Sequence, residues 1–273
     1  MPWRVPTADE LRPRLGERIA RPWWERAFTY AAYSRFLRRL ADRDRFVVVP
    51  LRELRAVTEP ARTIVGLRHD VDARLGSALR MAELERAEGL RASYFVLHSA
   101  AYYRHDAAFA AALRRLQELG HEVGLHNDLV TQQRLHGVDP GPYLCAELDW
   151  LRGEGVDVVG TAAHGSMDAA VAGYSNYDVF SQLSALDFGL EYEAYHLGED
   201  RYYSDARFDE RGRRWHPDEL DLADLRPGER LIVLIHPCHW DRSAAAKAAR
   251  LIRRALRHAF QTSASTSCWL SAL

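Results

Sequence analysis

Short apolar runs alternate with amphipathic stretches along most of the chain. Five of the runs have the length and the β-branched or aromatic character of buried strands. They are residues 63–67, 93–97, 121–126, 156–161 and 231–235. Apolar residues recur at helical spacing over 75–88, 106–119 and 143–152, and a glycine closes each of these stretches. This rhythm predicts parallel strands joined by helical crossovers.

The two ends of the chain and one internal stretch depart from this rhythm. Residues 1–60 predict a helical extension packed on a main domain of residues 61–273, and they include one short strand-like run, Phe46–Val49. Residues 172–228 are rich in Tyr, Asp and Gly, which predicts loops and short strands. Ser243–Phe260 predicts a terminal helix with a serine N-cap.

Composition restricts the class of protein without assigning an activity. The chain has 273 residues, 47% of them hydrophobic and 27% charged, which is ordinary for a globular soluble protein. A formal net charge of −1 gives no global field toward nucleic acid or an anionic membrane. No apolar run is long enough to span a membrane, and no secretory signal is visible. With three widely separated cysteines, this predicts a cytoplasmic protein without structural disulfides.

The first buried run changes character within one step. Ile64–Leu67 is apolar, and Arg68, His69, Asp70 and Asp72 follow almost at once. In an extended chain the two aspartates lie on one face and His69 lies on the other. Two carboxylates on one face repel each other unless a cation lies between them, and a divalent metal is the usual cation. The alternative is a solvated strand end whose acids begin the next turn.

Polar residues of the same kinds end three other apolar runs. His126 and Asp128 follow the third run, His164 follows the fourth, and His236 follows the last. The C-terminal ends of parallel strands meet at one mouth of a barrel, so these side chains are predicted to converge with the two aspartates. One Asp and two His residues can hold zinc with a position left open, while a second acid acts as base and a further His as acid. Taken singly, each histidine could equally be structural.

At these residues the chain resembles the polysaccharide deacetylase superfamily, also called the NodB-homology or carbohydrate esterase family 4 group. The likeness is greatest to the branch with RHDVD as its first motif. GHEVGLH at 120–126 resembles the second motif, and AAHGS at 162–166 stands where the third is expected. Tyr203–Asp205 followed by Trp215 is similar to a segment of that branch, and LIVLIHPCHW at 231–240 resembles its final strand with the catalytic histidine.

The resemblance extends from about residue 63 to residue 260 and implies a distorted, incomplete (β/α) barrel of about seven parallel strands. It also implies metal-dependent hydrolysis of an acyl group, most simply acetyl, on the nitrogen or oxygen of a sugar or sugar intermediate. Asp70 would be the general base and His236 the general acid, while Asp72 and His126 would hold the metal. Zn²⁺ is the expected ion, although this ligand set also accepts Fe, Mn or Co.

One position departs from the family pattern. The second histidine of the family's HxxxH pair falls at Val130, which cannot bind a metal. His164 is the predicted replacement ligand, with Asp128 as the alternative. His239 is an alternative to His236 as the general acid.

The residues around this centre lead to further expectations. Trp240, Trp215 and Asp205 are predicted to contact an acetylated carbohydrate or small-molecule substrate, with the tryptophans as stacking walls unless they are core residues. His121 precedes its strand and is expected to be structural. No nucleic acid or membrane partner is expected.

Three other interpretations remain open from the sequence. Cys238 lies beside two histidines and could be a thiol nucleophile, or it could be a small packed residue. The missing HxxxH histidine is compatible with a non-catalytic relative that has lost its metal, which metal analysis would reveal. The third interpretation is an amidase that acts on a small non-sugar molecule. Testing which compounds of a panel of acetylated sugars, ureides and amides are hydrolysed would distinguish it.

Overall fold

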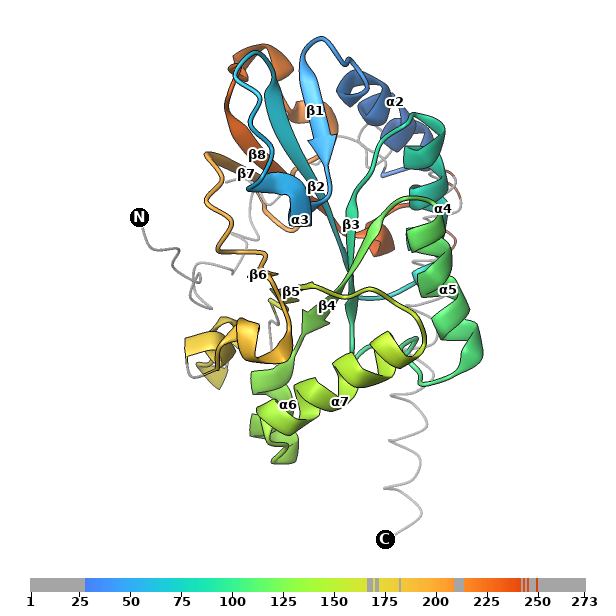
Figure 1. The fold of residues 1–273 in the computed structure, drawn as a ribbon. Helices are drawn as coiled ribbons and strands as arrows, with labels where there is room; N and C mark the ends of the chain where they lie inside the picture. The colour runs from blue at the N-terminus through green and yellow to red at the C-terminus, as the bar shows by residue number, and fades with distance from the viewer. Residues whose placement is uncertain are drawn as a thin grey trace, which may run out of the picture.

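A single parallel sheet forms the centre of the protein (Figure 1). The computed structural model describes residues 28–165, 172–181, 183–208 and 214–241, with isolated positions at 169, 243, 245 and 249. The strands in this part of the chain are β1 (Phe46–Val49), β2 (Thr63–Val71), β3 (Ser93–Leu97), β4 (Glu122–Asn127), β5 (Gly160–Ala163), β6 (Tyr192–Glu193), β7 (Arg201–Ser204) and β8 (Arg230–Ile235). Every pairing is parallel, and the order is β6-β5-β4-β3-β2-β8-β7, with β1 also paired to β2.

Three of the longer helices, α2, α4 and α5, lie along one side of the sheet (Figure 1). The helices are α2 (Tyr30–Leu40), α3 (Leu51–Leu54), α4 (Leu75–Ala87), α5 (Ala107–Glu118), α6 (Leu129–His136) and α7 (Pro140–Gly153). Short 3-10 helices are η1 (Asn176–Ser181), η2 (Ala185–Phe188), η3 (Pro217–Glu219), η4 (Leu222–Asp224) and η5 (Pro237–His239). The strand order ends at β6 and β7, which do not pair with each other, so the described sheet is a half barrel. This confirms the predicted distorted, incomplete (β/α) barrel.

Two local predictions were wrong, and one fell outside the described ranges. The fourth strand begins at Gly160 instead of Val156, because Val156 and Val158 are buried in the core without pairing to a neighbouring strand. Apolar spacing reports burial, and it does not report which residues join a ladder. The loop expected after β4 contains α6, which ends at Gly137 in the left-handed conformation (φ 65°). The predicted helix over 243–260 lies outside the continuous described residues.

Strand β2 presents two chemically different faces. Val65 and Leu67 belong to the core between the sheet and the helices, whereas Ile64 belongs to the smaller core inside the half barrel. The period of two therefore turns Asp70 toward the inside of the half barrel and His69 toward the helices. The contacts confirm this, since Asp70 Oδ2 lies 3.5 Å from a β4 side chain and His69 Nε2 lies 2.7 Å from α4.

The segment before β2 is part of the same sheet. Strand β1 pairs with β2 from Phe46–Thr63 to Val49–Gly66. Residues 46–49, within the stretch predicted to be an extension packed on the main domain, thus pair with the sheet. Helix α2 begins at an N-cap threonine, whose Oγ1 accepts a hydrogen bond from Ala32 N at 3.2 Å, and its buried side chains join the core between sheet and helices.

A fully buried carboxylate connects α2 to the strands. Glu85 of α4 accepts hydrogen bonds from the hydroxyls of Tyr33 on α2 and Tyr94 on β3, the latter at 2.8 Å. His69 Nε2 lies 2.7 Å from the same carboxylate, and its Nδ1 lies 3.2 Å from the carbonyl of Ile235 on β8. The network thus joins α2, α4, β2, β3 and β8 behind the face of β2 that carries the aspartates.

Glu85→Ala is expected to destabilise the fold by about 3–5 kcal/mol, because it leaves a buried imidazole and two buried hydroxyls without their acceptor. Urea unfolding followed by circular dichroism measures this. Glu83→Ala is the matched control, since Glu83 is exposed on the same helix and should leave the midpoint nearly unchanged. Equal midpoints for the two variants would contradict a structural role for the network.

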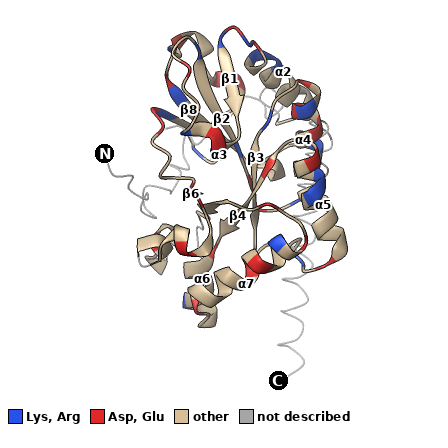
Figure 2. Ribbon diagram, viewed as in Figure 1, with Lys and Arg blue, Asp and Glu red and all other residues tan. Residues whose placement is uncertain are grey.

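Charges of both signs occur along the helices on one side of the sheet. Figure 2 shows basic and acidic residues mixed along α2, α4 and α5, in keeping with the net charge of −1. Among the described helices, none is both long and apolar enough to cross a membrane.

Candidate metal and catalytic site

The register of the sheet brings the polar strand ends to one level. Val71 of β2 pairs with Val96 of β3, and the next β3 residue, Leu97, pairs with His126 of β4. On the other edge of β2, His69 pairs with Ile235, which precedes His236. The end of β2 that carries the two aspartates is therefore flanked by a histidine on each side.

Three side chains from different strand ends form a potential ligand group. One donor atom each from Asp72, His126 and His164 lies within 4.8 Å of the others. His126 Nε2 lies 3.4 Å from Asp72 Oδ1, and the two imidazole centroids are 5.1 Å apart. The structure brings these three predicted residues together, whereas Val130, at the family's second histidine position, is a buried residue of α6.

The hydrogen bonding of His126 suits a metal ligand. Its Nδ1 donates to the carbonyl of Ala162 at 2.8 Å, so Nε2, which faces Asp72 and Asp70, is the nitrogen available to a metal. Asp72 Oδ1 is buried and makes no hydrogen bond. Burial alone would raise the pKa of Asp72, but the surrounding histidines outweigh it and lower that pKa, so the carboxyl is ionised. A buried, ionised carboxylate oxygen close to an available imidazole nitrogen fits a divalent cation.

Asp128 contacts His164 and accepts hydrogen bonds from two other side chains. Its Oδ2 accepts from Ser99 Oγ at 2.7 Å, and its Oδ1 accepts from Asn176 Nδ2 at 2.7 Å and lies 3.4 Å from His164 Nδ1. Asn176 also donates to the carbonyl of His164 at 3.0 Å. Because donors occupy both oxygens of Asp128, this carboxylate is suited to orient the imidazole and keep Nε2 free for a ligand.

Asp70 is held by an arginine two residues earlier on the same strand face. Arg68 Nε donates to Asp70 Oδ1 and Nη2 to Oδ2, each at 2.8 Å, and both side chains are buried. Burial alone would raise the pKa of Asp70, but Arg68 and the nearby His126 outweigh it and lower that pKa. The two-point contact fixes the carboxylate in one orientation and keeps it ionised.

On the opposite side of the centre, Asp205 receives two imidazoles. His236 Nδ1 donates to Oδ1 at 2.5 Å, and His239 Nδ1 donates to Oδ2 at 2.9 Å. Burial opposes a charge on His236, but Asp205 outweighs it and raises the pKa of His236 to about 9. His236 Nε2 lies 3.8 Å from Asp72 Oδ2, so a protonated imidazole faces the ligand group. Asp205 also accepts the backbone N–H of His236 at 3.0–3.1 Å, which marks this trio as a hydrogen-bonded unit and not a second cation site.

Comparison with known proteins returns solved structures only. The similar solved structures include family 4 carbohydrate esterases and a pseudoenzyme of that family. One is a family 4 carbohydrate esterase from Bacillus anthracis, with 15% identity over 83% of this chain and 85% of that chain and a TM-score of 0.38. Another is a CE4 esterase from Streptococcus mutans, with 12% identity over 78% and 81% of the two chains and a TM-score of 0.44. A third is a CE4 family pseudoenzyme from Bacillus anthracis, with 15% identity over 78% and 65% and a TM-score of 0.38.

No family model matches the chain, and no curated protein matches it. At these identities and TM-scores, nothing about the activity of the chain follows from the activities of its structural neighbours. The arrangement of its own side chains has to carry any functional conclusion.

Two of the predicted substrate contacts need correction. Trp240 is fully buried and packs against Phe28 and Tyr33 at centroid distances of 5.1 Å, so it has no exposed face for a sugar. Asp205 is also fully buried, and its oxygens are occupied by the two imidazoles. Trp240 is therefore a core residue, and Asp205 holds the two imidazoles. Trp215 is half-buried and stacks on Tyr203, with a centroid distance of 5.5 Å, so its predicted role as a wall stays a prediction.

The surroundings of Cys238 and His121 show what these two residues can do. Burial raises the pKa of Cys238 to about 12, so its thiol stays protonated at neutral pH and is a poor nucleophile. His121 lies at the start of β4, where Nδ1 accepts from Ala92 N at 3.2 Å and Nε2 donates to the carbonyl of Ala82 at 3.0 Å. His121 is therefore a satisfied buried residue far along the strand from His126, as expected.

Sequence reasoning gave no role to Arg68 or Asn176. Arg68 stands inside the RHDVD motif, and its spacing of two from Asp70 was the available signal for a shared face. Asn176 comes from the Tyr-rich stretch with no signal that links it to His164. The same stretch supplies Tyr195, whose ring centroid lies 4.4 Å from the guanidinium carbon of Arg68.

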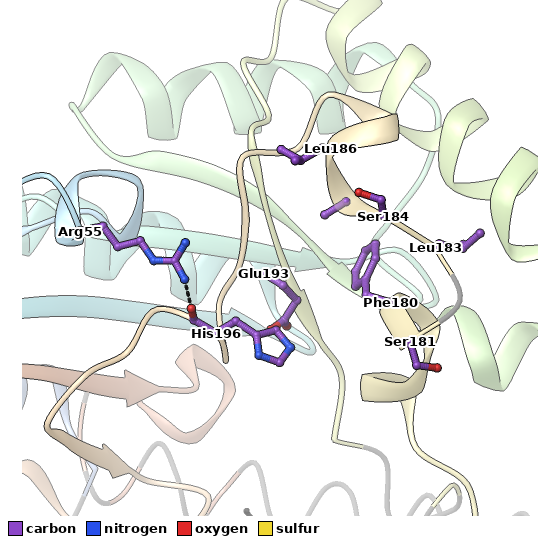
Figure 3. Close-up of a pocket in the computed structure, with 9 residues that line it drawn as sticks. Arg55, Phe180, Ser181, Leu183, Ser184, Leu186, Glu193 and His196 are labelled. Carbon is purple, nitrogen blue, oxygen red and sulfur yellow. Dashed lines mark hydrogen bonds and ion pairs between the residues drawn. The ribbon is translucent and has the colours of Figure 1, made fainter.

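A separate pocket lies beside β6 and contains none of the predicted site residues (Figure 3). Its volume is about 480 Å³, and Arg55, Phe180 and Glu193 contribute to its wall. Glu193 is buried, and its Oε1 accepts the backbone N–H of Ala163 at 3.0 Å, next to His164. The pocket thus adjoins the segment that carries one potential metal ligand.

Proposed function

We propose that the chain is a metal-dependent hydrolase that removes an acyl group, most simply acetyl, from the nitrogen or oxygen of a sugar or sugar intermediate. The observation that supports this is the order of groups across the centre. An arginine-held carboxylate lies on one side, a carboxylate with two imidazoles lies in the middle, and a carboxylate-held imidazolium lies on the other. Base, cation site and acid in that order suit hydrolysis of an acyl bond.

Asp72, His126 and His164 are the proposed metal ligands. The available Nε2 of His126 and the buried oxygen of Asp72 without a hydrogen bond support the assignment. A divalent ion held there, most simply Zn²⁺, supplies Lewis acidity toward an acyl carbonyl and lowers the pKa of water.

Asp70 and His236 carry out the two proton transfers. Asp70 is ionised and fixed, so it accepts a proton from water as the water oxygen attacks the acyl carbon. His236 carries a proton on Nε2, because Asp205 holds the Nδ1 side, and it donates that proton to the nitrogen or oxygen that leaves. The bond between acyl carbon and leaving atom breaks, giving a carboxylic acid and an amine or alcohol.

The test is to load the purified protein with Zn²⁺ and measure acetate release from acetylated amino sugars, acetylated xylose oligomers, simple amides and ureides. Release from the sugars supports the proposal. Release from amides or ureides alone would establish the small-molecule amidase instead. Stoichiometric metal without release from any compound would favour a binding protein, and no metal at all would favour a non-catalytic relative.

Alanine at Asp72, His126 or His164 is expected to lower bound metal to well below one equivalent, because each substitution removes one of three protein ligands. Mass spectrometry of dialysed protein gives the metal content. His136→Ala is the matched control, since His136 is an exposed histidine at the end of α6 and should keep full metal content. Full metal content in the His164 variant, with loss in Asp128→Ala, would transfer the third ligand position to Asp128.

A further inference from the structure

His239 is a second imidazole on the carboxylate that holds the proposed acid. Its Nδ1 donates to Asp205 Oδ2 at 2.9 Å, while His236 uses Oδ1. Asp205 is fully buried, and the backbone N–H of His236 approaches both of its oxygens. The reaction described above uses only His236 and gives His239 no task.

The shared carboxylate fixes the tautomer of His239. An ionised carboxylate can only accept hydrogen bonds, so the Nδ1 that contacts Asp205 must carry hydrogen. Burial lowers the pKa of His239, and the neighbouring His236 opposes its protonation, so the ring is neutral at neutral pH. A neutral imidazole with hydrogen on Nδ1 has a lone pair on Nε2. Among the described residues, no donor contacts that nitrogen.

The ring of His239 lies beside the imidazole that faces the ligand group. His239 ends η5, directly after the strand that supplies His236, and the two imidazole centroids are 5.2 Å apart. The His239 side chain is 22% exposed, whereas Asp205 is 0% exposed. In an imidazole the two nitrogens point to nearly opposite sides, so Nε2 lies on the side away from the buried carboxylate. Two rings at this spacing can contact neighbouring substituents of one small molecule.

We propose that His239 Nε2 accepts a hydrogen bond from a substrate hydroxyl on the carbon next to the one bearing the acylated atom. His239 is then a specificity-determining residue that favours acyl groups on polyols and sugars over those on plain alkyl chains. This inference rests on the proposed function. An acceptor fixed in place by Asp205 rewards a hydroxyl donor and offers nothing to a C–H at the same place.

The experiment compares two esters that differ by one hydroxyl, trans-2-hydroxycyclohexyl acetate and cyclohexyl acetate. The kcat/KM of the Zn²⁺-loaded protein for the hydroxylated ester is divided by its kcat/KM for cyclohexyl acetate. This ratio is then divided by the ratio of the two base hydrolysis rates without protein, which removes the intrinsic effect of the hydroxyl. The wild type is expected to prefer the hydroxylated ester by about 5–10-fold, the size of one neutral hydrogen bond, mainly through KM.

His239→Phe keeps a planar ring without an acceptor and is expected to abolish the preference, with unchanged metal content. His239→Gln is the matched rescue, because its amide can donate to Asp205 and its carbonyl can accept the hydroxyl, so part of the preference should return. The inference would be overturned if the wild type shows no corrected preference, or if the folded His239→Phe protein keeps the full wild-type preference. If His239→Phe does not fold, the preference of the wild type alone still decides. No hydrolysis of either ester, nor of 4-methylumbelliferyl acetate, would instead overturn the proposed function.

Discussion

His236→Ala is expected to lower kcat by about 10²–10⁴-fold with little change in bound metal, because the leaving atom loses a positioned proton donor. The loss should be larger for an acetamide than for an ester with a good leaving group, since an alkoxide of low basicity leaves without a proton more readily than an amine. Steady-state kinetics on 4-methylumbelliferyl acetate and an acetylated amino sugar measure the difference. Equal losses on both substrates would remove His236 from the acid role.

The pH dependence gives a second measure of the same residue. Asp205 raises the pKa of His236 to about 9, so the acid form should persist through neutral pH and be lost as the pH rises past that value. Asp205→Asn removes the negative charge, and the alkaline limb of the kcat profile should therefore move to lower pH. Asp200→Asn is a suitable control, because Asp200 lies on the surface before β7 and should leave the limb in place.

Asp70→Asn is expected to lower kcat by about 10²–10⁴-fold while the protein keeps its metal, because asparagine fills the same space but cannot take a proton. Arg68 can still donate one hydrogen bond to the amide oxygen, so the fold should be retained. Metal content and kcat measured on one preparation separate the role of base from that of ligand. Loss of metal in parallel with activity would make Asp70 a ligand instead.

The strand ends could be predicted because the chemistry of the chain changes shortly before the strand ends. In β2 the apolar run stops at Leu67 and charged residues follow at once, while the strand itself continues, still buried, to Val71. Parallel pairing then places such strand ends together. The convergence of Asp72, His126 and His164 follows from these two facts alone, without any knowledge of side-chain contacts.

The roles of the residues around the site could not be predicted in the same way, because these roles depend on contacts between distant segments. Asp205 lies 31 residues before His236, and only the pairing of β7 with β8 shows that it is an anchor and not a substrate contact. Trp240 was misjudged for the same reason. Its neighbours come from the chain before β1, and no local pattern distinguishes a buried tryptophan from an exposed one.

The pairing of β2 with β8 has a consequence for how the protein is made. Residues 64–69 pair with residues 230–235, so one edge of β2 has no partner until most of the chain has left the ribosome. During that interval the nascent half barrel exposes unpaired N–H and C=O groups beside an apolar core, which is a template for association with other chains. The last of the described strands therefore covers this edge of β2 and brings His236 beside the two aspartates in the same step. Protection of this edge and assembly of the proposed site are thus completed together.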